Sequence, residues 1–157
     1  MGANPHTPAD VPAEFGSPYA THLEVTVACA VRSGLLWPDC GILEFGCGDY
    51  STPALAAIAL AQQRRLCIVS SDPQWARRYA YLAGSWCEIR VIERAQWPHV
   101  DYGSGWGLVL VDNEQRVVQR CRHVLQLASR AKLVVLHDSQ VLGRCAPCWK
   151  AAYQQYR

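Results

Sequence analysis

Short, almost wholly apolar segments alternate with helical patterns along this chain, and this alternation limits the possible folds more than any other feature. The apolar segments are residues 42–45, 66–69, 87–93, 108–112 and 133–138. Strands that are apolar on both faces are typical of parallel sheets covered by helices on each side. We therefore predict an α/β fold with a Rossmann-like, doubly wound parallel sheet of five strands.

The segments between these strands carry the helical period. Helices are predicted over residues 18–35, 52–63, 73–82, 114–129 and 149–156. Five residues of the first helix share one face and are expected to be buried: Leu23, Val27, Ala30, Val31 and Gly34. Thr52 is predicted to cap the second helix, with Pro53 at its first position.

Domain organisation follows from where these patterns begin. Residues 1–16 contain three prolines and show no periodicity, so they are expected to form a flexible arm. Residues 17–157 hold all the predicted elements and are expected to form a single domain.

Charge and hydropathy argue against several classes of function. The formal charge of +2 and the isoelectric point near 8.1 are too mild for a nucleic-acid-binding surface. No apolar run approaches the ~18 residues of a membrane span, and no pattern of a secretory leader is present. The expectation is a soluble, cytoplasmic protein with no nucleic-acid or membrane partner.

The chain contains eight cysteines. Several lie in apolar strands or on apolar helix faces, where a free thiol behaves as a small hydrophobic group. Cys145 and Cys148 form a C-x-x-C pair, which is found in redox motifs and in halves of zinc sites. Because no second pair accompanies it, a structural role is favoured, and the redox and zinc functions are kept as alternatives.

Polar residues gather where the predicted strands end. These residues are Gly46, Gly48, Asp49 and Tyr50 after the first strand, Ser70, Ser71 and Asp72 after the second, Asp112, Asn113 and Glu114 after the fourth, and His137 and Asp138 after the fifth. The carboxyl ends of parallel strands share one edge, so these residues are expected to line one pocket. The alternative is that these residues only cap the helices that follow them. Capping alone could explain Asp72 before Pro73, but it does not explain Glu44, which lies within a strand.

The loop Gly46-Cys47-Gly48 follows the first strand, and glycine lets a ligand approach the backbone closely. A pyrophosphate requires bare amides and no nearby anion, whereas Glu44 and Asp49 flank this loop. Carboxylates attract ammonium groups and accept hydrogen bonds from ribose hydroxyls. The predicted pocket therefore suits a nucleoside with a cationic tail better than it suits NAD.

These residues resemble a known family. The segment Leu43-Glu44-Phe45-Gly46-Cys47-Gly48 resembles motif I of the class I S-adenosylmethionine (SAM)-dependent methyltransferases. Residues 49–53, 71–75, 111–113 and 136–139 resemble a compact bacterial branch of that superfamily, so the resemblance covers about residues 18–140. It implies the strand order 3-2-1-4-5, SAM as cofactor, and methyl transfer to a hydroxyl or amine of a small molecule or sugar.

The resemblance also implies which residues contact SAM. Glu44 and the glycine loop would hold the methionine end, an acid ending the second strand would hold the ribose, and residues 93–97 would border the adenine. The expected cofactor contacts are Glu44, Gly46, Cys47, Gly48, Asp49, Tyr50, Ser70, Asp72 and Asp112.

Two features depart from the family pattern. Ser70 stands where the acid of the second strand is usual, so either Asp72 replaces that acid or the site is weakened. The family normally adds a helix and an antiparallel hairpin after the fifth strand, but residues 139–157 suffice for the helix alone. We expect a minimal or truncated sheet without the hairpin, with a homodimer as the candidate cover for the edge of the fifth strand.

For catalysis, His137 is the expected general base, because the intrinsic pKa of histidine lies near neutrality. Asp138 or Asp112 would orient it, and an ordinary strand-end histidine is the alternative. A divalent metal shared by the two aspartates is the competing mechanism, but two oxygen ligands are few for Mg²⁺, so no metal is predicted. The alternative functions are a catalytically inactive SAM- or nucleoside-binding protein of the same fold and, with less support, an NAD-binding enzyme.

Overall fold

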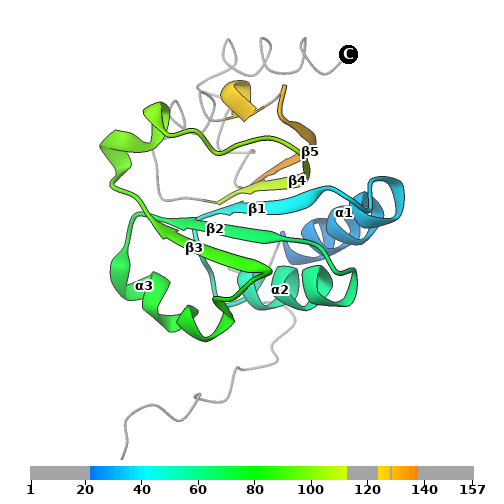
Figure 1. The fold of residues 1–157 in the computed structure, drawn as a ribbon, viewed down its shortest axis with the longest axis horizontal. Helices are drawn as coiled ribbons and strands as arrows, with labels where there is room; N and C mark the ends of the chain where they lie inside the picture. Colours follow the sequence, from blue (N-terminus) through cyan, green and yellow to red (C-terminus); the bar gives the residue numbers. More distant parts are fainter. Residues whose placement is uncertain (1–21, 113–123, 128, 138–157) are drawn as a thin grey trace, which may run out of the picture.

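The computed structural model describes residues 22–112, 124–127 and 129–137, and a parallel sheet lies at its centre (Figure 1). The sheet is 5-stranded, in the order β3-β2-β1-β4-β5, and every neighbouring pair is parallel. The strands are β1 (Gly41–Phe45), β2 (Leu66–Ser70), β3 (Cys87–Val91), β4 (Trp106–Val111) and β5 (Ala131–Leu136). The predicted fold class and strand order are confirmed.

The direction in which successive strands are added to the sheet reverses beside β1. The chain proceeds outward from β1 through β2 to β3, and then returns so that β4 pairs with the other side of β1. Such a reversal is the topological switch point at which open α/β sheets bind their ligands, at the carboxyl ends of the strands. The carboxyl ends of β1 and β4 are therefore the place to look for a site.

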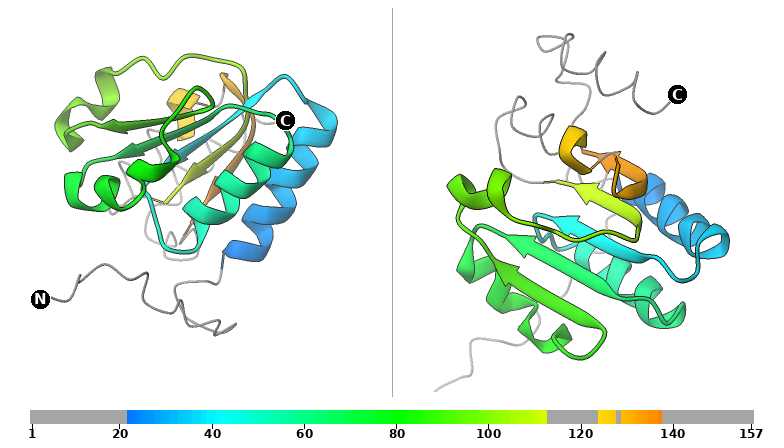
Figure 2. Two further views of the ribbon diagram at one scale, coloured as in Figure 1. Left: turned by 60° about the horizontal axis from the view of Figure 1, so that its bottom comes forward. Right: turned by 45° about the horizontal axis from the view of Figure 1, so that its top comes forward.

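Successive strand residues point to opposite faces, and this alternation produces two separate cores. On β1, Leu43 and Phe45 belong to one core and Ile42 to the other. The first core is closed by residues of the segment 92–102 and by the helical residues 124–127. The second is closed by α1 (Leu23–Leu36) and α2 (Ser51–Ala61), which lie together on one side of the sheet (Figure 2).

Helix α1 packs on α2, β4 and β5 and runs opposite to the strands. Its buried residues are small: Thr26, Ala30, Ser33 and Gly34. A Cβ at Gly34 would lie 2.0 Å from Oε1 of Gln62, so a larger residue here would have to displace the Gln62 side chain at the end of α2. Val31 is 39% exposed, and its predicted burial is wrong because the buried face is centred on these small residues.

Two further expectations about helices are corrected. Helix α2 begins at Ser51, with Tyr50 at the N-cap position, so Thr52 lies inside the helix and does not cap it. The segment predicted as one helix over residues 73–82 is α3 (Pro73–Arg78) followed by the 3₁₀ turn η1 (Ala80–Leu82). Asp72 caps α3, since its Oδ1 accepts from the amides of Gln74 and Trp75.

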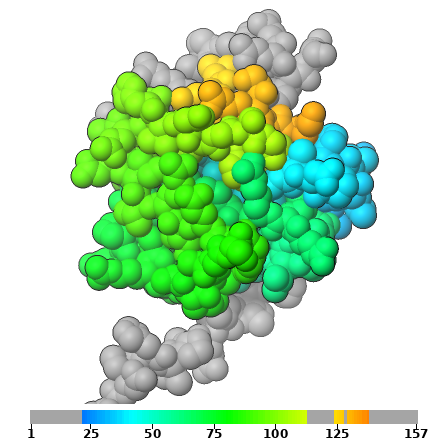
Figure 3. All heavy atoms as spheres, viewed as in Figure 1, coloured from blue at the N-terminus to red at the C-terminus, as the bar shows by residue number. Residues whose placement is uncertain are grey.

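After β3 the chain forms the 3₁₀ segment η2 (Arg94–His99), and this segment covers the first core. Trp97 is buried against Phe45, and its indole donates a 2.7 Å hydrogen bond to the carbonyl of Ile92. In the space-filling view, the green residues around α3, β3 and the following segment cover much of the visible face (Figure 3).

At the opposite edge of the sheet, Arg64 joins the amino end of β1 to α1. Its side chain is buried and donates to the carbonyls of Ala30, Cys40 and Gly41, at 3.1, 2.5 and 3.3 Å. It also donates to Oε1 of Gln62 at 2.9 Å. This guanidinium thus supplies donors to buried backbone oxygens at the start of β1 and on α1.

Several predictions fall on residues outside the described ranges. They are the arm of residues 1–16, most of the helix predicted over 114–129, the helix over 149–156, the missing C-terminal hairpin and the pair Cys145 and Cys148. The homodimer predicted at the β5 edge stays a prediction. Among the described helices, none combines the length and apolar character needed to cross a membrane.

Candidate functional site

The glycine loop leaves β1 at the switch point. Gly46 has φ +88°, a left-handed conformation that strains any other residue, and its amide donates to the carbonyl of Val69 at 2.8 Å. Gly48 follows at the entry to α2, and a Cβ placed there would meet, among the described residues, only Oγ of Ser51 within 4 Å, at 3.3 Å. Apart from this contact, the described part of the chain leaves the outer side of the loop open to a ligand.

Glu44 lies directly beneath this loop and is fully buried. Strand alternation turns its side chain toward the start of α2, where Ser51 donates to Oε1 at 2.6 Å and Thr52 donates to Oε2 at 2.9 Å. The hydroxyl of Thr52 also accepts from the amide of Gly48 at 2.9 Å. Burial raises the pKa of Glu44 to about 8, and the negative charge of Asp112 adds to the increase.

The end of β2 brings Ser70 next to the loop. Burial raises the pKa of the neighbouring Cys47 thiol. Ser70 also closes a turn with Asp72, because its Oγ donates to the carbonyl of Asp72 and accepts from its amide, each at 3.1 Å. The carboxylate of Asp72 is exposed and caps α3 through Oδ1. Among the described residues, both capping bonds use this oxygen, so Oδ2 is available to the hydroxyl of a ligand.

Asp49, the other acid of the loop, is bound by α3 and the residue after it. Arg78 approaches its Oδ1 to 2.8 Å, and the hydroxyl of Tyr79 donates to the same oxygen at 2.9 Å. Burial and the neighbouring carboxylate raise the pKa of Tyr79, so that hydroxyl stays protonated. Asp49 thus fixes α3 to the loop, and its predicted contact with a cofactor stays a prediction. Tyr50, the next residue, is half-buried at the start of α2.

Asp112 and His137 meet at the ends of β4 and β5. Nδ1 of His137 lies 2.6 Å from Oδ1 of Asp112. Val111 pairs with Leu136 in the sheet, so the next residue on each strand is carried to the same place. Two backbone bonds fix the pair: the amide of Asp112 donates to Phe45 at 2.8 Å, and the amide of His137 donates to Val111 at 3.1 Å.

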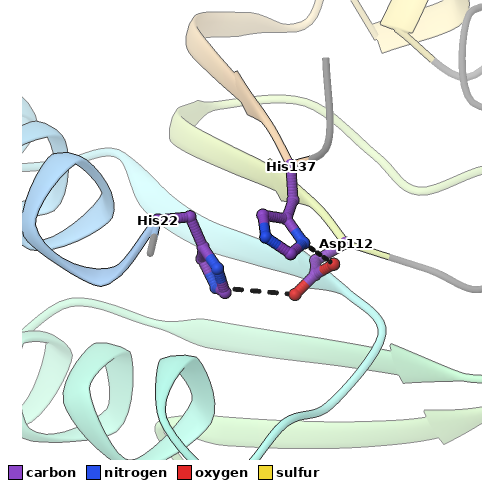
Figure 4. A group of neighbouring side chains, drawn as sticks. All are labelled: His22, Asp112 and His137. Atoms are coloured by element: carbon purple, nitrogen blue, oxygen red, sulfur yellow. Dashed lines mark hydrogen bonds and ion pairs between the residues drawn. The ribbon is translucent and has the colours of Figure 1, made fainter. Parts of the chain in front are cut away.

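His22, which the sequence analysis did not select, completes this group (Figure 4). It precedes α1, and its Nε2 lies 3.5 Å from Oδ2 of Asp112. The rings of His22 and His137 lie against each other, with centroids 3.8 Å apart, and each directs one nitrogen toward the carboxylate. The side chains of His22, Asp112 and His137 are only 10%, 21% and 15% exposed.

The structure brings together some of the predicted residues and leaves others apart. Glu44, the glycine loop, Ser70 and Asp72 lie at the ends of β1 and β2, and Asp112 and His137 at the ends of β4 and β5. Asp138 lies outside the described residues, so only Asp112 is seen to orient His137. Of residues 93–97, the first four are exposed, whereas Trp97 points into the core and offers no surface to an adenine.

Comparisons of this chain with family models, with curated proteins and with solved structures found no match. Inferences about function therefore depend on the fold and on the geometry of this edge of the sheet.

Proposed function

We propose that this protein is a SAM-dependent methyltransferase acting on a hydroxyl or amine of a small molecule or sugar. One observation carries the proposal: the segment that resembles motif I places its glycine loop at the switch point, beside the strand ends that bear Asp112 and His137. A nucleoside site next to a histidine–carboxylate pair would suit methyl transfer to a protic acceptor, which needs alignment of the reactants and a base.

The residues of the loop fit the proposed cofactor. The open side of Gly48 allows a ligand to lie against the backbone, and Oδ2 of Asp72 is the candidate partner for a ribose hydroxyl. When bound, SAM supplies an electrophilic methyl group attached to a sulfonium. The chain itself has to hold the acceptor in line with that group and remove its proton.

His137 is suited to remove the proton. A carboxylate offers only acceptor oxygens, so the 2.6 Å contact with Asp112 places the ring hydrogen of His137 on Nδ1. Nε2 then carries the lone pair that accepts a proton from the acceptor. Asp112 fixes the orientation of the ring and stabilises the imidazolium that forms.

Glu44 supports the loop from below. Its contacts to Ser51 and Thr52, and from Thr52 to the amide of Gly48, determine the shape of the loop. With a pKa of about 8 the carboxyl is largely neutral at neutral pH, and a neutral carboxyl attracts an ammonium group only weakly. Direct contact between Glu44 and the methionine end of SAM stays a prediction.

A nucleoside-binding protein without catalytic activity is the second candidate. It is favoured by the end of β2, where Ser70 replaces the usual acid and uses its hydroxyl to close the turn with Asp72. It is also favoured by Asp49, whose Oδ1 is held by Arg78 and Tyr79. These contacts leave fewer acids for the ligand than the family pattern provides.

The test is calorimetric titration of the protein with SAM, S-adenosylhomocysteine and NAD, using the wild type and Gly48→Val. We expect SAM and S-adenosylhomocysteine to bind, NAD not to bind, and Gly48→Val to abolish binding because its side chain occupies the open side of the loop. Gly84→Val is the matched control, since a Cβ at Gly84 meets nothing within 4 Å in the part of the chain that the structure describes. Binding of NAD alone, or undiminished binding to Gly48→Val, would refute the proposed site.

A further inference from the structure

We propose that His22, Asp112 and His137 form a three-ligand site for a divalent transition metal ion, with zinc as the best-fitting ion. The three residues come from the start of α1 and the ends of β4 and β5, and each offers one ligand atom within 4.8 Å of the others. Figure 4 shows the two imidazoles side by side, each with one nitrogen directed toward the carboxylate, so the three donors lie close together. This proposal does not depend on methyl transfer: zinc on Nδ1 of His137 and a ring hydrogen on that nitrogen are alternative states, and the zinc-bound state replaces His137 as general base.

The spacing of the donor atoms suits one ion. Two ligands of a tetrahedral zinc, each bound at about 2.0–2.1 Å, lie roughly 3.3 Å apart. Nε2 of His22 and Oδ2 of Asp112 are separated by 3.5 Å, which already matches that value. Nδ1 of His137 and Oδ1 of Asp112 are 2.6 Å apart, and the ligand atoms of the three residues lie within 4.8 Å of one another, so side-chain rotations are needed to bring all three to that spacing.

The scaffold around the donors is rigid. The amide of Asp112 is bonded to β1 and that of His137 to β4, so the sheet holds both backbones in place. The carbonyl of His22 accepts the 3.0 Å bond from the amide of Thr26, and this bond fixes His22 to the first turn of α1. A preformed set of ligands on such elements loses little entropy when it binds an ion.

The donor types select the kind of metal. Imidazole nitrogen is a ligand preferred by zinc, iron, nickel and copper, whereas Mg²⁺ and Ca²⁺ prefer sets made of oxygen. Two imidazoles with one carboxylate are the ligand set of several catalytic zinc sites, in which the fourth position is open to water or substrate. We therefore expect zinc to bind with a free coordination position, at the edge of the sheet where ligands of this fold bind.

The experiment measures metal binding directly, with no need for catalytic activity. The tag-free full-length chain carries Cys145→Ser and Cys148→Ser, so that its C-x-x-C pair cannot bind zinc. After removal of metal with a chelator, Zn²⁺ is titrated in competition with a chromophoric chelator, and Mg²⁺ is titrated separately. We expect one equivalent of zinc to bind tightly and Mg²⁺ to bind undetectably.

Variants identify the ligands. His22→Ala and His137→Ala should each weaken zinc binding by more than the roughly 10–100-fold typical of losing an outer-shell partner. His99→Ala is the matched control, because His99 is exposed on η2, outside the three-residue group. Zinc should raise the midpoint of thermal unfolding of the parent and of His99→Ala, but not that of His22→Ala. Should His22→Ala fail to fold, His22→Gln keeps a side chain of similar size without the imidazole.

Either of two results would overturn the proposal. One is the absence of stoichiometric zinc binding in the parent, which would leave the group as a hydrogen-bonded cluster. The other is zinc binding of equal strength in the parent, His22→Ala and His137→Ala, which would place the ion elsewhere. Neither result bears on SAM binding, so failure here is distinguishable from failure of the proposed function.

Discussion

Thr52 donates a 2.9 Å hydrogen bond to the buried carboxyl of Glu44, although Glu44 lies in the middle of the sheet and Thr52 in a helix. The same hydroxyl accepts the amide hydrogen of Gly48 at 2.9 Å. A buried acid is thereby connected to the backbone of the loop at the switch point. The protonation state of Glu44 therefore affects the stability of the fold beneath the candidate site.

The first prediction concerns the pH dependence of stability. Burial raises the pKa of Glu44 from 4.5 to about 8, so between these values the folded state binds a proton that the unfolded state releases. Stability from this group is thus complete below pH 4.5 and is lost as pH rises toward 8, by at most about 1.4 kcal/mol per pH unit. Glu44→Gln should remove this loss, as measured by urea unfolding between pH 5 and 8. Parallel curves for the two proteins would show that the folded-state pKa is not raised.

The second prediction separates capping from ligand binding at Asp72. Asp72→Ala removes the cap of α3 and should cost about 1 kcal/mol of stability, whereas asparagine caps helices as well as aspartate does. Asp72→Asn should therefore keep the thermal midpoint and yet weaken S-adenosylhomocysteine by about 1.5–3 kcal/mol, because a hydrogen bond to a charged group is lost. Normal affinity in Asp72→Asn would show that the ribose is held by another group.

The third prediction concerns the opposite edge of the sheet. Arg64→Met keeps an unbranched side chain but removes the guanidinium hydrogen bonds to the carbonyls of Ala30, Cys40 and Gly41, so it should cost about 2–4 kcal/mol. Arg65→Met is the control: Arg65 is exposed and stacks on Trp106 with its guanidinium 4.1 Å from the ring centroid, a contact of about 0.5–1 kcal/mol. Equal losses in urea unfolding would contradict the structural role assigned to Arg64.

The sequence predicts the sheet well because apolar runs and helical periods are local. Period-2 alternation also places Asp112 and His137 on the face of the sheet that bears Leu110 and Val135, and this is the face that α1 covers. His22 could not be found in this way, because its position depends on α1 running back over β4 and β5. Nothing in the residues around His22 reports that long-range packing.

The contacts of Asp49 show the same limit. Its acidity and its place beside the glycine loop indicate a ligand contact, but its observed partners, Arg78 and Tyr79, lie at the end of α3, beyond α2 and β2 in the chain. An acid that follows a strand can thus bind either a ligand or a helix distant in the sequence, and only tertiary structure distinguishes the two. Trp97 is a similar case. Its place after β3 in the sequence predicts a contact with the adenine, but the structure buries it in the core.

The last prediction asks whether the protein is an enzyme. A general base acts on the transition state and touches the bound cofactor little, so His137→Ala should leave SAM affinity nearly unchanged. It should slow methyl transfer by about 10²–10⁴-fold. Asp112→Asn should also slow it, because an amide in place of the carboxylate favours the wrong ring tautomer of His137.

The assay first requires a panel of hydroxylated small molecules, amines and sugars as acceptors. If coordination to a metal ion activates the acceptor instead, with water or buffer taking its proton, a chelator will abolish turnover of the wild type, whereas the base mechanism expects turnover to persist. If SAM binds and no acceptor on the panel is methylated, the inactive nucleoside-binding protein becomes the better description.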